Sequence, residues 1–319
     1  MKFDNHPSYV KDIVFIDGIT RVGKSALLAI IAVFKKSEVP QFCYPLEHIL
    51  PAYSLKHISK SFSKSYINTY FNEAIYNTFI SRNLNFRKNE LTSIYSHYNA
   101  QNYKNRLLMS EGDSVIKRLK KTKNFFPFLA HDFMVNYFKL KDFKLNFKLI
   151  EIYRNPVDTV MSWYNKGWGT RFINDTRSWT LSLNYKSKLL PWYTVGYEKK
   201  YLEANELERC VLNVIDLNQR AIKNHRKIGK NKKIFVIKFE NLLTDPGTIL
   251  VKLKKFLNSD FIKNPKKYLK KERLPRKYDY ASTLKKKNYI KKKISPELFQ
   301  KLDRLEKAYL KNNHGIRIN

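Results

Sequence analysis

The sequence predicts an α/β protein with three layers, in which helices cover both sides of a central, mainly parallel sheet. Residues 13–16 (IVFI) form an apolar run that ends at Asp17, as is typical of a strand buried on both faces. Residues 147–153 and 234–239 predict two further strands of this sheet. The first two strands are each followed by a turn and a helical pattern, which is the alternation expected of parallel strands.

The other elements follow from local patterns along the chain. Helices are expected at 26–34, at 66–82, where apolar residues recur at helical spacing, and at 113–121. Residues 125–130 (FFPFLA) predict another buried strand despite Pro127, and helices are expected at 156–164, 205–227 and 246–257. Residues 41–51, which carry Glu47 and His48, are interpreted as an aromatic-rich loop.

Length and composition favour one domain with a large core. The chain has 319 residues, of which 43% are hydrophobic and 14% aromatic, and this composition excludes a disordered chain. No linker or internal repeat is evident. We therefore expect a single domain over 1–319, with a basic segment at 264–293 and a final helix at 295–313 packed on it.

The net charge of +35 has two explanations. A strongly positive field attracts polyanions such as nucleic acid, acidic glycans or an anionic membrane. The chain is also rich in Lys, Asn, Ile, Phe and Tyr, the residues that an AT-rich genome favours. We prefer this compositional explanation.

The cysteines and the N-terminus suggest a cytoplasmic protein. Cys43 and Cys210 lie far apart in the sequence and predict no disulfide framework, which fits a reducing compartment. The first residues contain no apolar leader segment, and no apolar run is long enough to span a membrane.

A phosphate-binding motif follows the first strand. Residues Gly18 to Ser25 read G-x-x-x-x-G-K-S and lie between a predicted strand and a predicted helix, which is the context that this motif requires. Glycines allow backbone N–H groups to surround an anion, and the helix N-terminus adds partial positive charge. Lys24 supplies a mobile cation, Ser25 a hydroxyl, and Arg21 a guanidinium at the mouth of the loop.

A second strand-to-helix turn carries the motif R-N-P-x-D-x-x-x-S, at Arg154, Asn155, Pro156, Asp158 and Ser162. Arginine makes forked contacts with phosphate, and a helical serine eight residues later can face the same side. In this order, the first loop, His131, the second turn and the FENLLTDP segment at 239–246 resemble the sulfotransferase superfamily. Its sulfate donor is 3′-phosphoadenosine 5′-phosphosulfate (PAPS), which leaves as adenosine 3′,5′-bisphosphate (PAP).

The resemblance implies a P-loop-related fold and two donor contacts. Arg154 and Ser162 would bind the 3′-phosphate, and the 5′-phosphosulfate end would lie on the first loop. That loop departs from the family pattern because Lys24 replaces a threonine, so either Arg21 or Lys24 could neutralise the bridging oxygen. The donor-loop residues implied are Gly18, Arg21, Val22, Gly23, Lys24, Ser25 and Ala26. No metal ligand is implied. The acceptor would be a hydroxyl group, on a glycan or a small metabolite.

Two residues are candidates for the base that deprotonates the acceptor. His131 ends a predicted strand at the place where cytosolic sulfotransferases keep a catalytic histidine. Glu47 follows the first helix, where glycan and tyrosine sulfotransferases keep a glutamate. Both residue types can act as a general base. We favour Glu47 slightly.

Two other functions remain open. A kinase or NTPase using ATP and Mg²⁺ would suit the complete G-x-x-x-x-G-K-S motif, but no apolar run ends in a suitable aspartate, because Asp216 falls in a helical pattern. A nucleic-acid-binding protein would use the lysines and tyrosines of 264–293, although such runs are more often a solvated face. Nucleic acid is therefore an unlikely partner.

Overall fold

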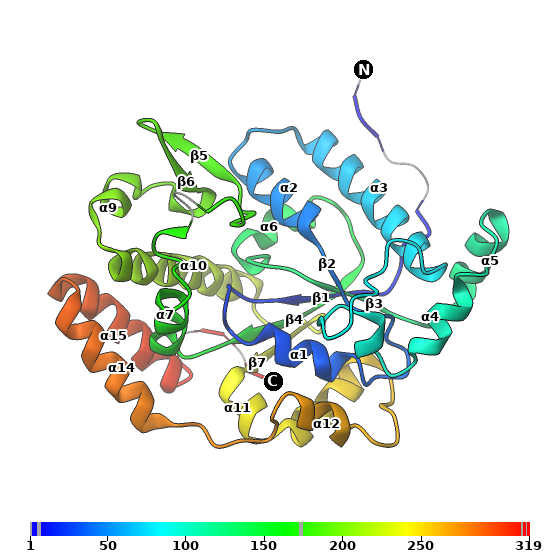
Figure 1. Cartoon of the computed structure of the whole chain (residues 1–319). Coiled ribbons are helices and arrows are strands. Elements are labelled where there is room, and N and C mark those ends of the chain that lie inside the picture. Colours follow the sequence, from blue (N-terminus) through cyan, green and yellow to red (C-terminus); the bar gives the residue numbers. More distant parts are fainter. Residues whose placement is uncertain (1, 5–7, 172–174, 314, 317) are drawn as a thin grey trace.

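Five parallel strands form the central sheet of the computed structural model, which describes residues 2–4, 8–171, 175–313, 315–316 and 318–319 (Figure 1). Their order in the described chain is β2-β3-β1-β4-β7. In that order, the strands span Gln41–Phe42, Phe126–Leu129, Ile13–Asp17, Phe147–Tyr153 and Ile234–Lys238. The predicted parallel sheet and its strands are confirmed.

The strand order reverses at β1: β2 and β3 lie on one side of β1, and β4 and β7 lie on its other side. β1 and β4 pair directly, with Asp17 opposite Glu151, so the turns that follow them emerge side by side. In open α/β sheets, ligands bind at such a reversal, beyond the carboxyl ends of the strands. The topology thus brings the two sequence motifs to one edge.

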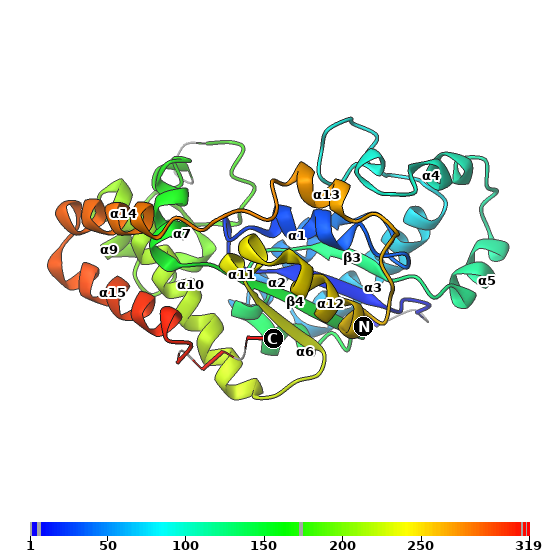
Figure 2. The ribbon, with the colours of Figure 1, turned by 90° about the horizontal axis from the view of Figure 1, so that it is seen from below.

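Helices cover both faces of this sheet, as predicted. In Figure 1, α2 (Tyr44–Ser54), α3 (Lys60–Phe79) and α6 (Tyr137–Lys141) lie above the strands, and α1 (Lys24–Ile31), α11 (Phe239–Thr244) and α12 (Pro246–Leu257) lie below. Figure 2 shows α1, α11 and α12 from their outer side, in front of the strands. Phe15 of β1 packs against Phe71, Phe133 and Phe147 in the core between the sheet and the upper layer.

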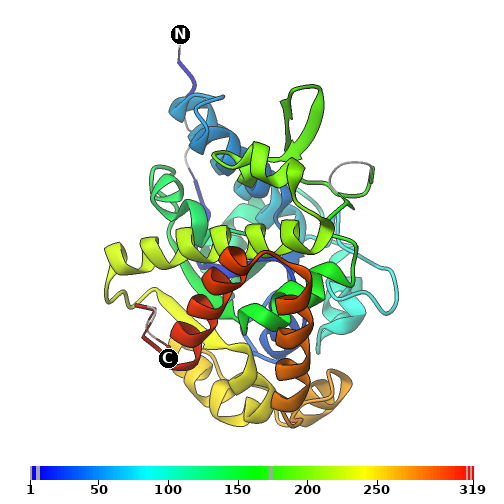
Figure 3. The ribbon, with the colours of Figure 1, turned by 90° about the vertical axis from the view of Figure 1, so that its left-hand side faces the viewer.

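A group of helices closes one end of the sheet. α10 (Glu206–Ile228) packs on α7 (Pro156–Tyr164) and on α15 (Pro296–Leu310), and α14 (Tyr280–Lys293) packs on α7 and α15. Figure 3 shows α14 in orange beside α15 in red on this side. The remaining α-helices and strands of the described residues are α4 (Ala100–Arg106), α5 (Asp113–Lys121), α9 (Glu198–Glu203), α13 (Lys266–Lys271) and the hairpin of β5 (Ser182–Tyr185) and β6 (Lys188–Pro191).

The prediction of a loop at 41–51 is wrong, because most of this segment lies in α2. The segment contains two prolines, but Pro45 lies in the first turn of α2, where its missing N–H costs nothing. Leu46 and Leu50 are spaced one turn apart and are both buried, which holds the helix on the core. Glu47 therefore sits on a helix rather than on a loop.

Pro127 does not interrupt β3. The Phe126 N–H donates to Asp12 O, just before β1, and the Ala130 N–H donates to Ile16 O of β1. Successive backbone N–H groups of a strand point to opposite sides, so the Pro127 nitrogen points away from β1. There, β2 first pairs with β3 at Phe128. The missing donor therefore costs no ladder bond.

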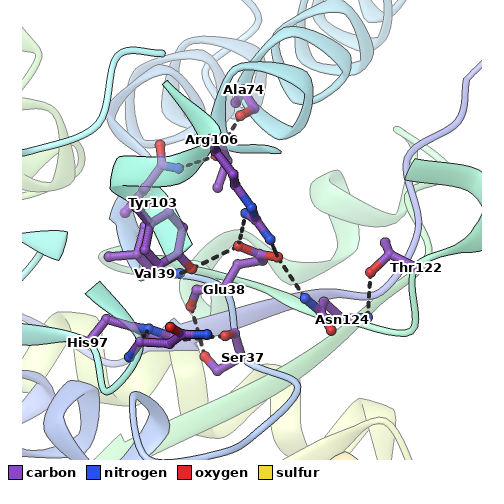
Figure 4. A network of polar contacts seen from close by, with 12 residues as sticks. Ser37, Glu38, Val39, Ala74, His97, Tyr103, Arg106, Thr122 and Asn124 are labelled. Carbon is purple, nitrogen blue, oxygen red and sulfur yellow. Dashed lines mark hydrogen bonds and ion pairs between the residues drawn. The ribbon is translucent and has the colours of Figure 1, made fainter. Parts of the chain in front are cut away.

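A buried ion pair fastens α4 to the segment before β2 (Figure 4). Arg106 donates to both carboxylate oxygens of Glu38, at 2.7 and 3.0 Å. The Tyr103 hydroxyl and the Asn124 amide donate to the same carboxylate, at 2.8 and 2.7 Å. Burial alone would raise the pKa of Glu38, but the hydrogen bonds and charge of Arg106 hold this pKa below its usual value. The carboxylate is therefore ionised and satisfied.

Candidate active site

The loop between β1 and α1 depends on its two glycines. Gly18 has a φ of 138° and Gly23 a φ of 106°, which favours glycine. A Cβ on Gly18 would lie 2.5 Å from Ile152 O, and a Cβ on Gly23 would overlap the ring of Phe239. The close approach of the neighbouring elements thus requires both glycines of the motif.

Lys24 begins α1, and its buried side chain turns back into the loop. Its ammonium donates to Gly18 O, and to Ile19 O at 2.9 Å. Burial lowers the pKa of Lys24, while three nearby carboxylates, led by Asp17, favour the charged form. Ser25 is the next residue of the helix and is exposed.

Val22 and Ala26 complete the predicted donor loop. Val22 is buried, with its Cγ2 beside Gly18, so its side chain belongs to the core. Ala26 lies in the first turn of α1, where its N–H donates to Gly23 O at 3.1 Å. Neither residue therefore offers a polar side chain to a ligand, and the Ala26 N–H is already used within the first turn of α1.

Arg21 and Arg154 lie together, as predicted for the carboxyl edge of β1 and β4. Arg154 Nη1 donates to Arg21 O at 3.0 Å, and Arg21 Nε donates to Ser162 Oγ at 3.1 Å. Burial, and then the charge of Arg154, lowers the pKa of Arg21. Arg154 Nε is buried without a hydrogen-bond partner, and no described carboxylate lies within 4.0 Å of either guanidinium. Two cations and a hydroxyl thus form a site suited to an anion.

The second turn is held rigidly by its own motif. Asn155 accepts from the N–H of Val157 at 2.8 Å and caps α7. The Asn155 N–H donates to Glu240 Oε1 at 3.0 Å, and Glu240 belongs to the FENLLTDP segment. The second turn and the FENLLTDP segment, both parts of the family resemblance, are therefore in direct contact.

Asp158 of the same motif binds the basic C-terminal segment. Its buried carboxylate accepts from Lys286 at 2.6 Å, from Thr283 at 3.0 Å and from Tyr278. Burial alone would raise the pKa of Asp158, but the bond to Lys286 and the other hydrogen bonds lower it. Part of the positive charge of 264–293 therefore serves to dock α14 on α7.

The two candidate bases form a hydrogen-bonded pair. His131 Nδ1 and Glu47 Oε1 are 2.8 Å apart, although His131 follows β3 and Glu47 lies in α2. Because a carboxylate oxygen accepts, His131 Nδ1 is the donor of this bond. In the neutral tautomer that this bond selects, Nε2 keeps its lone pair. Both residues line the same cavity as the first loop.

Asp132 is a site residue that the sequence analysis did not identify. It follows His131 with a φ of 62°, and it lines the cavity beside Lys24. Its Oδ1 is buried without a hydrogen-bond partner, and burial raises the pKa of Asp132. Its place after β3, next to the histidine, was the signal that could have identified it.

The cavity has a volume of about 310 Å³, within the size range of small-molecule sites. Together with residues of the loop and of α2, it is lined by aromatic and basic residues of the long connection after α7: Trp168, Arg171, Arg177, Trp179 and Trp192. Trp163 lies elsewhere, buried in the core, where its Nε1 donates to Thr20 O at 2.7 Å. Trp163 therefore holds the first loop from behind.

Two further searches of the described residues gave no result. No three His, Cys, Asp or Glu side chains in the described ranges are grouped to hold a metal ion. No helix within those ranges is long and apolar enough to cross a bilayer.

Comparisons with known proteins found one family model and several solved structures that are similar to this chain. The family model of the sulfotransferase domain matches residues 11–303. Among solved structures, the sulfotransferase domain of the curacin biosynthetic pathway is 15% identical, with a TM-score of 0.44, over 82% of this chain and 77% of that chain. The domain of the Synechococcus PCC 7002 olefin synthase is 12% identical, with a TM-score of 0.45, over 97% and 98%. No curated protein matches.

The extent of the family match decides the class. It covers most of the chain, including both turns at the carboxyl edge of the sheet and the pair of candidate bases. The chain therefore belongs to the sulfotransferase domain family, and it is a transferase of the sulfotransferase class.

Proposed function

We propose that the protein transfers a sulfuryl group from PAPS to a hydroxyl group of a glycan or small metabolite, and that PAP leaves. The observation that carries this proposal is the pair of guanidiniums of Arg21 and Arg154 beside the Ser162 hydroxyl, with no described carboxylate within 4.0 Å of either guanidinium. Such a cluster suits a phosphate. Because it lies next to the first loop, one nucleotide with phosphates at both its 3′ and 5′ ends would satisfy both sites.

The proposal divides the cations between the two ends of the donor. Arg21 contacts Ser162, so we assign Arg21 with Arg154 to the 3′-phosphate. Lys24 lies in the first loop near Glu47, so we assign Lys24 to the oxygen that bridges sulfur and the leaving phosphate. A cation there stabilises the charge that develops in the transition state. Sulfuryl transfer resembles phosphoryl transfer, in which positioning and charge neutralisation dominate.

For the base, we propose His131, held by Glu47. The Nε2 lone pair of His131 takes the acceptor proton as the acceptor oxygen attacks sulfur and the bond to the phosphate oxygen breaks. Glu47 fixes the imidazole through Nδ1 and stabilises the imidazolium that forms. This arrangement differs from the sequence-based preference for Glu47, and it gives both residues a role.

One observation favours a second candidate, a kinase that uses ATP and Mg²⁺. Asp132 follows a strand next to β1 and lies with Lys24 in the cavity, which is the position of a magnesium-orienting acid in nucleotide hydrolases. Asp216 cannot take this role, because it lies in α10 and pairs with Arg220 at 2.8 Å.

Calorimetry with PAP and with ATP-Mg²⁺ tests the proposal. Tighter binding of the bisphosphate, unchanged by a metal chelator, is the expected result. Preference for ATP-Mg²⁺ would instead favour the kinase. A sulfate-transfer assay with labelled PAPS and a panel of phenols, alcohols and sugars then tests the reaction itself.

A further inference from the structure

The connection between α7 and α9 gives the cavity a wall that differs from the wall formed by the loop and α2. Trp168, Arg171, Arg177 and Trp179 all line the cavity and come from this connection. Trp179 reaches α2, because its carbonyl oxygen lies 3.0 Å from His48 Nε2 and its ring meets Tyr44 edge-on at 6.3 Å. This wall therefore adjoins α2, the helix that carries Glu47.

The charge of this wall is not balanced. Arg171 Nε and Arg177 Nε both pair with Asp175, at 3.0 and 3.1 Å from its two oxygens. The bonds and charge of Arg177, with that of Arg171, lower the pKa of Asp175, so one ionised carboxylate faces two guanidiniums. The two carboxylates among the described residues that line the cavity, Glu47 and Asp132, lie with His131 and Lys24. One positive charge thus remains on this wall.

The same wall offers flat aromatic surfaces. The Arg171 guanidinium lies over the Trp168 ring, 5.1 Å from its centroid, and the Trp179 side chain is largely exposed. Indole faces stack on aromatic rings, and on the apolar faces of sugars, without any fixed hydrogen-bond pattern. An arginine held on a ring is oriented to make a forked contact with a carboxylate or sulfate.

We propose that the acceptor carries an anionic group in addition to its hydroxyl, and that an aromatic or sugar ring joins the two groups. The anion would lie on Arg171 and Arg177, the ring against the exposed Trp179, and the hydroxyl at His131. This assignment rests on the proposed sulfotransferase function and names the class of acceptor that the site selects. The bond that forms joins the acceptor oxygen to sulfur, the sulfur–phosphate oxygen bond breaks, and His131 takes the proton.

The test compares acceptors that differ only in charge: 4-hydroxyphenylacetate with 4-hydroxyphenylacetamide, and a methyl glucuronide with the matching methyl glucoside. With PAPS, the full-length chain should show kcat/KM at least about tenfold higher for the acid of the preferred ring type, as expected for a charge-assisted pair. In the double variant Arg171→Gln/Arg177→Gln, this ratio should fall to about one. The control Lys188→Gln, on the exposed hairpin, should keep the ratio.

Binding separates this inference from the proposed function. Calorimetry on protein saturated with PAP should show the acid binding at least about tenfold more tightly than its neutral partner, and only with both arginines present. Equal affinities or equal rates within both pairs, or a preference that persists in the double variant, would overturn the inference. If PAP itself fails to bind, the proposed function is wrong, while the acid and its partner, titrated alone, still decide the inference.

Discussion

Glu47 and His131 are 84 residues apart in the sequence and share a hydrogen bond of 2.8 Å between Oε1 and Nδ1. If His131 is the base and Glu47 holds it, His131→Asn should lower kcat by about two to four orders of magnitude. Glu47→Gln should cost less, because an amide oxygen can still accept from Nδ1 but lacks the charge. Rates with saturating PAPS and a fixed acceptor measure both effects.

The double variant Glu47→Gln/His131→Asn shows which of the two residues is the base and which one positions it. Residues that act as one unit are not additive, so the double variant should be no slower than His131→Asn alone. If Glu47→Gln alone proves to be the more severe change, and adding His131→Asn costs nothing more, then Glu47 is the base. PAP affinity serves as the control and should change little in all three proteins.

Arg154→Ala should remove the discrimination between nucleotides with and without a 3′-phosphate. Arg154 contacts the backbone of Arg21, and its Nε has no partner, so a phosphate there gains a charge-assisted contact. Affinity for PAP should fall by about tenfold or more, while affinity for AMP should change little. Calorimetry with both nucleotides measures the ratio, and Ser162→Ala should lower it less. An equal loss for PAP and AMP would place Arg154 away from the 3′-phosphate.

The sequence predicted those parts of the site that are contiguous in the chain. The first loop and the Arg154 turn each lie between a strand and a helix, so their motifs carry their own structural context. Strand ends of a parallel sheet meet at one edge, and from this the meeting of Arg21 and Arg154 could be predicted.

Contacts between distant segments could not be predicted in this way. Glu47 and His131 were treated as rivals, because nothing local shows that α2 turns one toward the other. The bond of Asp158 to Lys286 spans 128 residues, and it gives a packing role to lysines that the sequence alone leaves as surface charge. The prolines of α2 concealed a helix that is stabilised by burial of Leu46 and Leu50 rather than by local propensity.

Glu38→Gln should destabilise the fold strongly. The side chains of Glu38 and Arg106 are 1% and 11% exposed, so loss of the carboxylate charge leaves a largely buried guanidinium without its counter-ion. Breaking a buried pair in this way typically lowers the free energy of unfolding by about 3–5 kcal/mol. Urea unfolding followed by fluorescence measures the change.

The matched control for Glu38 is Glu111→Gln, which breaks an exposed pair with Arg82. Exposed pairs contribute about 0–1 kcal/mol, so this variant should unfold close to the wild type. Similar losses in the two variants would mean that solvent reaches the Glu38 pair.

His97 is held as a neutral imidazole beside this ion pair. Its Nε2 lies 2.9 Å from Ser37 O, and the Asn99 N–H donates to Nδ1 at 3.2 Å, so both ring nitrogens have partners that suit the neutral form. Burial lowers the pKa of His97 from 6.5 to about 4, with the positive charge of Arg106 contributing less. A second proton on Nδ1 would face the Asn99 N–H.

Stability should therefore fall as the pH drops through the window between these two values of the His97 pKa. Between about pH 6.5 and pH 4 the unfolded chain binds a proton that the folded chain refuses, so the contribution of His97 is complete above pH 6.5 and is lost as the pH approaches 4. The loss amounts to about 3 kcal/mol.

Other groups titrate in the same window, so the measurement is the difference in unfolding free energy between the wild type and His97→Asn at several pH values. The wild type should be more stable than His97→Asn at pH 7, and this difference should shrink toward pH 4. A difference in unfolding free energy that stays constant from pH 7 to pH 4 would mean that the folded state accepts the proton on His97.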